Sequence, residues 1–162
     1  MDSRDMSIDA AKFTPEQIKK RAYLRIAHVL YEHWEEGTGP HSRLFDILLN
    51  HFVKINKNEF IVGDSVAYSA AGSGGPEHVV PCAFIIGKCL EKFEQKKSEQ
   101  EVAEYIEANL KIVRVTQDER KRLDSLPGLK AGMPDTWKDG DDIMVRLHEA
   151  KILFKLLPIT NG

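Results

Sequence analysis

The chain has 162 residues, 42% of them hydrophobic, which is the size of one ordinary globular domain with its own core. Its 23 basic and 25 acidic side chains give a formal net charge of −2, which argues against non-specific binding of nucleic acid over the whole surface. No transmembrane span, signal peptide or lipidation motif stands out, so we expect a cytoplasmic protein with no membrane partner.

The N-terminal part predicts a lead-in and two helices. Residues 1–12 are polar and without periodicity, which favours a disordered lead-in, and 13–162 would form a single globular domain. Thr14-Pro15-Glu16-Gln17 has the pattern of a capping box and opens a helix that ends near Gly37. A second helix is predicted over 42–54, and the short link between the two indicates an antiparallel helical hairpin.

The next segment changes pattern. Phe60-Ile61-Val62 and Val66-Ala67-Tyr68 are short and rich in β-formers, and Gly63-Asp64 between them predicts a β-hairpin. Ala70 to Pro76 is rich in Gly and small residues, which predicts a loop that either lies beside a site or has no special role.

The rest of the chain is mostly helical. Cys82 and Cys89 lie two turns apart on a predicted helix, about 10 Å, too far for a disulfide, so we expect apolar core thiols of a reducing compartment. The predicted fold is α+β and mostly helical: the N-terminal hairpin packs on a small ββα-like centre. Helices are predicted over 81–97, 99–109, 116–123 and 143–150, and a strand over 111–115.

One group of residues has the chemistry that phosphodiester hydrolysis needs: a base, a cation and a rigid frame. His78 titrates near neutral pH and would deprotonate water. Glu77 precedes it on a predicted strand and would hold a divalent cation on the opposite side. Asn109 precedes a second strand and would hold the imidazole or the loop in place.

These residues lie in three strings that resemble the HNH, or His-Me finger, endonuclease superfamily. The strings are Glu77-His78-Val79-Val80-Pro81, Asn109-Leu110-Lys111-Ile112-Val113 and Thr116-Gln117-Asp118-Glu119-Arg120. The resemblance covers residues 59–124. It implies an HNH-like nuclease that hydrolyses DNA or RNA with a divalent metal.

The resemblance also implies residue roles. Glu77 would bind the metal, His78 would be the general base and Asn109 would be the brace. In the family, the last helix completes the metal shell. Asp118 or Asp124 would supply that carboxylate here, in an oxygen site that suits Mg²⁺.

A compact basic patch follows the same strings. It consists of Arg114, Arg120, Lys121 and Arg122. The patch would contact phosphates of the nucleic acid, or it is the solvated face of an amphipathic helix.

The last helix also motivates an alternative. Alignment on Thr116 pairs Arg120 with Asp124 at the ligand positions, and counting from Asn109 pairs Asp118 with Arg122. In both registers an Arg replaces one ligand, and a guanidinium cannot bind a metal cation.

The alternative is a catalytically inactive HNH-like protein that binds a protein or a nucleic acid, for example a phage anti-defence or regulatory protein. An Arg near Glu77 would replace the cation there by an ion pair. In a third hypothesis the domain is unrelated and helical, His78 is a buried histidine at a strand end, and Asn109 simply ends a helix.

Overall fold

The computed structural model describes residues 12–39, 43–44, 47 and 60–158. Nearly all of the predicted lead-in and most of the predicted helix over 42–54 lie outside these residues, so the N-terminal hairpin stays a prediction. No described helix combines the length and the apolar character needed to cross a membrane.

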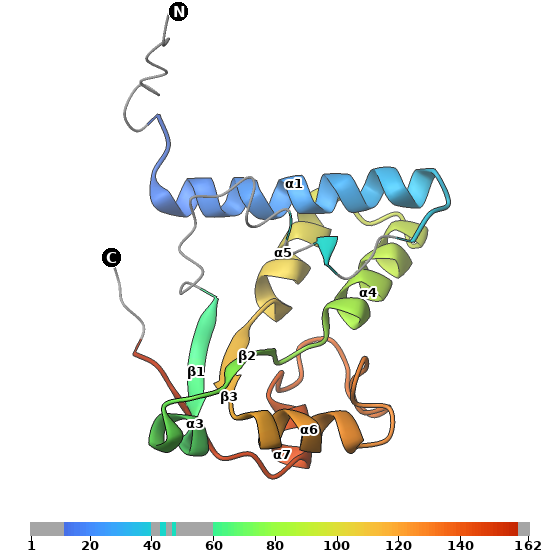
Figure 1. The fold of residues 1–162 in the computed structure, drawn as a ribbon. Helices are drawn as coiled ribbons and strands as arrows, with labels where there is room; N and C mark the ends of the chain where they lie inside the picture. The colour runs from blue at the N-terminus through green and yellow to red at the C-terminus, as the bar shows by residue number, and fades with distance from the viewer. Residues whose placement is uncertain (1–11, 40–42, 45–46, 48–59, 159–162) are drawn as a thin grey trace, which may run out of the picture.

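The described residues form helices around one small mixed sheet, so the predicted α+β, mostly helical class is confirmed. In Figure 1, α1 lies across one end of the molecule with α4 and α5 beside it, and the sheet, α6 and α7 make up the other end. The elements are α1 (Pro15–Glu35), β1 (Ile61–Ser65), α3 (Val66–Ala71), β2 (Gly75–His78), α4 (Cys82–Glu94), α5 (Glu99–Asn109), β3 (Ile112–Val115), α6 (Gln117–Ser125), α7 (Val145–Glu149) and β4 (Phe154–Leu156).

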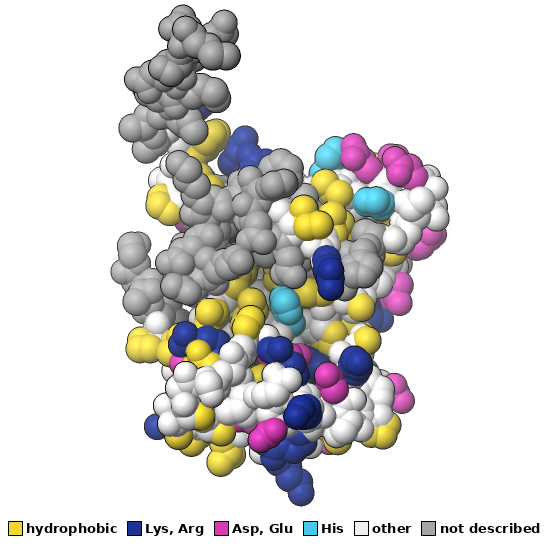
Figure 2. Space-filling view, viewed as in Figure 1, with side chains coloured by type: hydrophobic (Ala, Val, Ile, Leu, Met, Phe, Trp, Pro, Cys, Tyr) yellow, Lys and Arg dark blue, Asp and Glu magenta, His cyan; other side chains and the backbone are white. Residues whose placement is uncertain are grey.

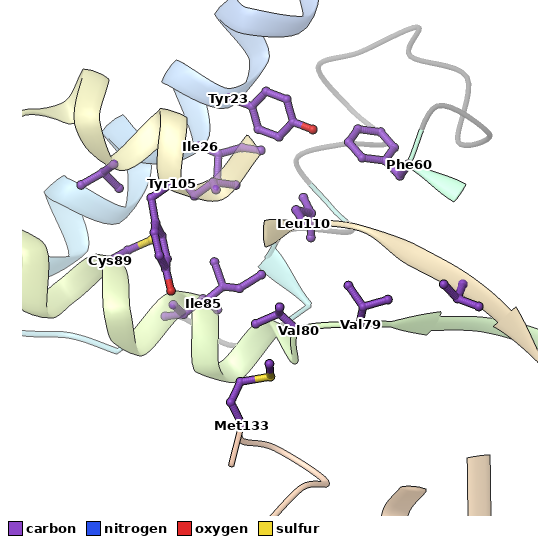
Figure 3. Close-up of a cluster of buried hydrophobic side chains, with 14 of the residues drawn as sticks. Tyr23, Ile26, Phe60, Val79, Val80, Ile85, Cys89, Tyr105, Leu110 and Met133 are labelled. Atoms are coloured by element: carbon purple, nitrogen blue, oxygen red, sulfur yellow. The ribbon is translucent and has the colours of Figure 1, made fainter. Parts of the chain in front are cut away.

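The core lies between α1, α4 and α5 and continues under the sheet. The predicted capping box opens α1: the Thr14 hydroxyl accepts from the Gln17 amide at 3.2 Å, and the Gln17 side chain accepts from the Thr14 amide at 2.8 Å. Cys89 is fully buried, and burial raises the pKa of its thiol to about 12, which agrees with an inert core thiol. Figure 3 shows the cluster, which includes Tyr23, Ile26, Val79, Val80, Ile85, Cys89, Tyr105, Leu110 and Met133.

The sheet has the strand order β2-β3-β1-β4. β1 pairs with β3 in parallel, while β2 pairs with β3 and β4 with β1 in antiparallel fashion. β2, β3 and α6 therefore follow one another as strand, antiparallel strand and helix, with α4 and α5 inserted between the two strands.

The predicted hairpin over 60–68 is wrong. Residues 61–65 form one strand that continues through Gly63-Asp64, with a register irregularity against β3 between Ile61 and Gly63, and Val66 begins α3. The Ser65 hydroxyl caps this helix by accepting from the Tyr68 amide at 2.9 Å. Each side of β1 pairs with a strand distant in sequence, and local β-propensity cannot indicate such partners.

Most residues of the predicted loop over 70–76 belong to a helix or a strand. α3 extends to Ala71, and Gly72 ends it in the left-handed conformation, with φ 65°. β2 begins at Gly75. The segment therefore delivers the chain directly to the edge strand that carries Glu77 and His78.

Candidate functional site

Glu77 lies on β2, on the sheet face that α6 covers. The register pairs it with Val113 of β3, whose side chain is fully buried on the same face. The Glu77 side chain is only 18% exposed. A half-buried carboxylate at this position needs a cation or hydrogen-bond donors nearby.

Two arginines supply that charge. Arg120 of α6 places its Nε 3.3 Å from Oε2 of Glu77, and Arg146 of α7 places one terminal nitrogen 3.7 Å from Oε1. Burial raises the pKa of the Glu77 carboxyl; Arg146 and Arg120 oppose this shift, and the nearby Asp124 carboxylate adds to it. The desolvation of Glu77 therefore outweighs the attraction of both cations.

Arg146 is fully buried and ties three segments together. Its Nε donates to the Leu129 carbonyl at 2.8 Å, and Nη1 donates to the carbonyls of His78 at 2.8 Å and Val79 at 3.3 Å. Burial lowers the pKa of this guanidinium, and Glu77 opposes the shift. Arg146 thus provides the positive charge and the donors at the end of β2.

The sequence pattern does not mark Arg146 as a site residue. It lies between the apolar residues Val145 and Leu147 on a short helix. An arginine in such a run is seldom left unpaired when the run packs inward. The apolar neighbours therefore indicate that Arg146 is buried and paired, but they do not identify the group it pairs with.

The same two arginines close the outer edge of β2. The Val79 amide bonds to the Lys111 carbonyl, and bonding positions alternate along an antiparallel pair, so the backbone groups of Pro76 and His78 point away from β3. Arg120 donates to the Pro76 carbonyl at 2.6 Å and Arg146 to the His78 carbonyl. Pro76 has no amide to leave unpaired, which suits an edge position.

His78 lies on the other face of the sheet. The register places it beside Ile112, and successive side chains of a strand point to opposite faces. Its side chain is half-buried, on the side of the sheet away from Glu77 and α6. The predicted base and the predicted metal ligand therefore diverge, and α6 approaches only the ligand.

Asn109 is the last residue of α5 and is 6% exposed. Its side-chain amide donates to the Tyr105 carbonyl, 2.8 Å away in the same helix. The segment after His78 is held instead by a backbone bond from the Val79 amide to the Lys111 carbonyl at 3.0 Å. The expectation that Asn109 braces the loop from a facing strand is corrected: its amide is used within α5.

The predicted basic patch is divided between two faces. Arg114 points away from α6 and forms two bonds to Asp64, Nε to Oδ1 at 2.5 Å and Nη2 to Oδ2 at 2.7 Å. Arg120 turns toward Glu77, which leaves Lys121 and Arg122 exposed on α6. Figure 2 shows basic and acidic side chains intermingled over the region where Figure 1 draws α6.

Asp118 and Asp124, the other predicted ligands, are exposed on α6. The carboxylate that α6 buries is Glu119, 3% exposed, whose Oε1 accepts from the Ser65 hydroxyl at 2.8 Å. The Glu119 carboxylate is therefore not available to bond back to the Thr116 amide, and the Thr116 hydroxyl alone caps α6 by accepting from the Glu119 amide. This buried pair fastens α6 to β1 and was not predicted.

The described residues do not fit a divalent metal ion at Glu77. Among residues 12–39, 43–44, 47 and 60–158, no three His, Cys, Asp or Glu side chains come together to hold one. Both Glu77 oxygens face guanidinium groups, which repel a metal cation. The arrangement is suited to an ion-pair network that fixes the edge of the sheet.

Comparisons with known proteins add no relative: no protein-family model, curated protein or solved structure matches the chain.

Proposed function

We propose that this chain is a catalytically inactive HNH-like protein that works by binding a protein partner. The observation that carries the proposal is the position of Glu77 between Arg120 and Arg146. Two guanidinium groups supply at this carboxylate the positive charge that a metal ion would bring to a nuclease.

The order of elements supports the HNH-like part of the proposal. β2 and β3 are antiparallel and α6 follows β3, which is the strand, strand and helix order that the resemblance implies. Arg120 lies on α6, the helix that carries metal ligands in that family. An arginine there keeps the helix and the strand together and removes a ligand.

Charge favours a protein partner over nucleic acid. Two of the four arginines and lysines predicted to contact phosphates, Arg114 and Arg120, are committed to carboxylates of the chain itself. The other two share the exposed surface of α6 with Asp118 and Asp124, and the whole chain has a net charge of −2. Such a surface lacks the excess positive charge that supports binding of a polyanion.

The competing proposal is a metal-dependent HNH nuclease. It is favoured by the position of Glu77 and His78 at the end of β2, with the antiparallel strand β3 and the helix α6 following after α4 and α5. It requires Arg120 and Arg146 to leave Glu77 when an ion binds.

A cleavage assay separates the two. Purified full-length chain is incubated with supercoiled plasmid or single-stranded RNA and Mg²⁺, Mn²⁺ or Zn²⁺, beside His78→Ala and Glu77→Gln. The proposal predicts that wild type and both variants cleave no faster than buffer with every ion. Cleavage by wild type that disappears in His78→Ala would establish the nuclease instead.

A further inference from the structure

The strand β4 forms the other edge of the sheet. It follows β1 at the end of the strand order, and the structure describes no strand beyond it. The Val66 amide donates to the Leu153 carbonyl and the Leu157 amide to the Val62 carbonyl, each at 2.8 Å. In an antiparallel pair these bonds alternate, so the amides and carbonyls of Phe154 and Leu156 point away from β1.

This edge also exposes apolar side chains. Leu153 is 75% exposed and Leu156 is 63% exposed, and Val66 and Leu157 beside them are 44% and 41% exposed. These four make up most of the large hydrophobic side chains that the described residues leave in solvent. Apolar side chains beside unpaired strand groups are the features that edge-strand docking uses.

We propose that β4 docks an extended segment of another protein, which adds a strand to the sheet and carries an acidic residue flanked at alternate positions by apolar ones. The inference rests on the proposed binding function and identifies its surface. Backbone bonds to Phe154 and Leu156 would hold the segment, and the side chains of β4 would select it.

The selection follows from the alternation of β4. Leu153, Lys155 and Leu157 point to the same face, as apolar, basic and apolar side chains. An antiparallel segment bonded to Phe154 and Leu156 places one residue directly opposite Lys155. These two residues form a non-hydrogen-bonded pair, in which the side chains lie closer than in a hydrogen-bonded pair. An acidic residue is favoured there, and apolar residues two positions away lie near Leu153 and Leu157.

The same geometry disfavours a second copy of this chain. In the antiparallel register that pairs Phe154 of one copy with Leu156 of the other, Lys155 lies opposite Lys155. Like charges directly opposite one another destabilise a strand pair, and an edge lysine protects natural sheets against self-pairing. The edge therefore accepts a segment with complementary charge.

A displayed library of extended peptides tests the proposal. Eight-residue peptides with randomised positions are selected against full-length wild type, Lys155→Glu, Leu156→Pro and Lys20→Glu. Lys20→Glu makes the same charge change on α1, outside the sheet. Leu156→Pro removes an outward amide and leaves the ladder to β1 intact. Circular dichroism confirms that each variant is folded.

Wild type and Lys20→Glu should enrich peptides with a central Asp or Glu between apolar residues, and Leu156→Pro should enrich none. Lys155→Glu should reverse the preference to a central Lys or Arg, with a change of about fivefold in the affinity ratio of matched peptides. Enrichment that is equal in wild type and Leu156→Pro, or no enrichment at all, overturns the inference. So does light scattering that shows a dimer lost in Leu156→Pro. Each of these results leaves the cleavage test of the proposed function unchanged.

Discussion

The two edges of the sheet differ in what lies beside their outward backbone groups. At β2, Arg120 and Arg146 bind the outward carbonyls of Pro76 and His78 and pair with Glu77 between them. At β4, the outward groups of Phe154 and Leu156 have no strand beside them among the described residues, and leucines surround them in solvent.

The difference shows what an ion-pair network does in this fold. The arginines reach β2 from α6 and α7, so closing that edge also fastens both helices to the sheet. Lys155 on β4 opposes pairing with an identical strand and favours a partner strand that carries an acidic residue opposite it. We therefore infer a structural role for the edge that resembles a nuclease site, and we propose the other edge as the one that takes a partner.

Removal of Arg146 should have the largest effect on stability. Arg146→Ala leaves Glu77 half-buried with one cation fewer and withdraws the donors of three carbonyls. We expect the free energy of unfolding in urea to fall by about 3–5 kcal/mol. Arg122→Ala, an exposed change on α6, is the matched control and should shift it by less than about 0.5 kcal/mol. Equal losses in the two variants would refute the role given to Arg146.

Removal of Arg120 should have a smaller effect. Arg120→Ala loses the ion pair with Glu77 and the bond to the Pro76 carbonyl, but its side chain is 34% exposed, so water replaces part of both. We expect a loss of about 1–2 kcal/mol by urea unfolding. Glu77→Gln made alone and together with Arg120→Ala completes a double-mutant cycle. A coupling energy near zero would show that the two side chains do not interact.

The raised pKa of the Glu77 carboxyl predicts the sign of a pH dependence of stability. Its pKa in the folded chain is raised above the ordinary 4.5, so the folded state binds the proton more tightly than the unfolded state does. Its contribution to stability is fully present below pH 4.5 and is lost as the pH rises through the folded pKa. Urea unfolding across this pH range should show that the free energy of unfolding of wild type falls relative to that of Glu77→Gln as the pH increases. A difference that moves the other way would mean that the arginines, not burial, control this pKa.

The smallest effect is expected at the open edge. Leu156→Ala removes a side chain that is 63% exposed and leaves the backbone bonds of β4 unchanged. Its free energy of unfolding should stay within about 0.5 kcal/mol of wild type. A large loss would show that Leu156 packs on the protein itself and would remove β4 from consideration as a docking edge.

The sequence predicted the elements whose signals are local. The capping box predicted at Thr14 opens α1, and the helices predicted over 81–97 and 99–109 form as α4 and α5. It failed where distant partners decide. Residues 61–65 were expected to turn back at Gly63-Asp64, but they stay extended because β3 and β4 pair with them on either side, and part of the predicted loop over 70–76 becomes strand at Gly75 and Pro76 through pairing with β3.

The sequence predicted which kinds of charged side chain meet at the candidate site better than it predicted where they lie. An arginine beside Glu77 was one of the sequence-based alternatives, and Arg120 occupies that position. Glu77 and His78 were expected on opposite sides of a strand, and they lie there, whereas the face that α6 covers depends on a register and a packing that one strand of sequence does not reveal. Arg146 lies 69 positions beyond Glu77, and only the fold brings the two side chains together.

Calorimetric titration of the full-length chain with Mn²⁺ and Mg²⁺, on wild type and Glu77→Gln, tests most directly whether arginines take the place of a metal ion. We predict isotherms that are the same for both proteins and contain no saturable one-to-one binding. Saturable binding to wild type that Glu77→Gln abolishes would contradict the account, because it would show that an ion displaces the guanidinium groups from Glu77.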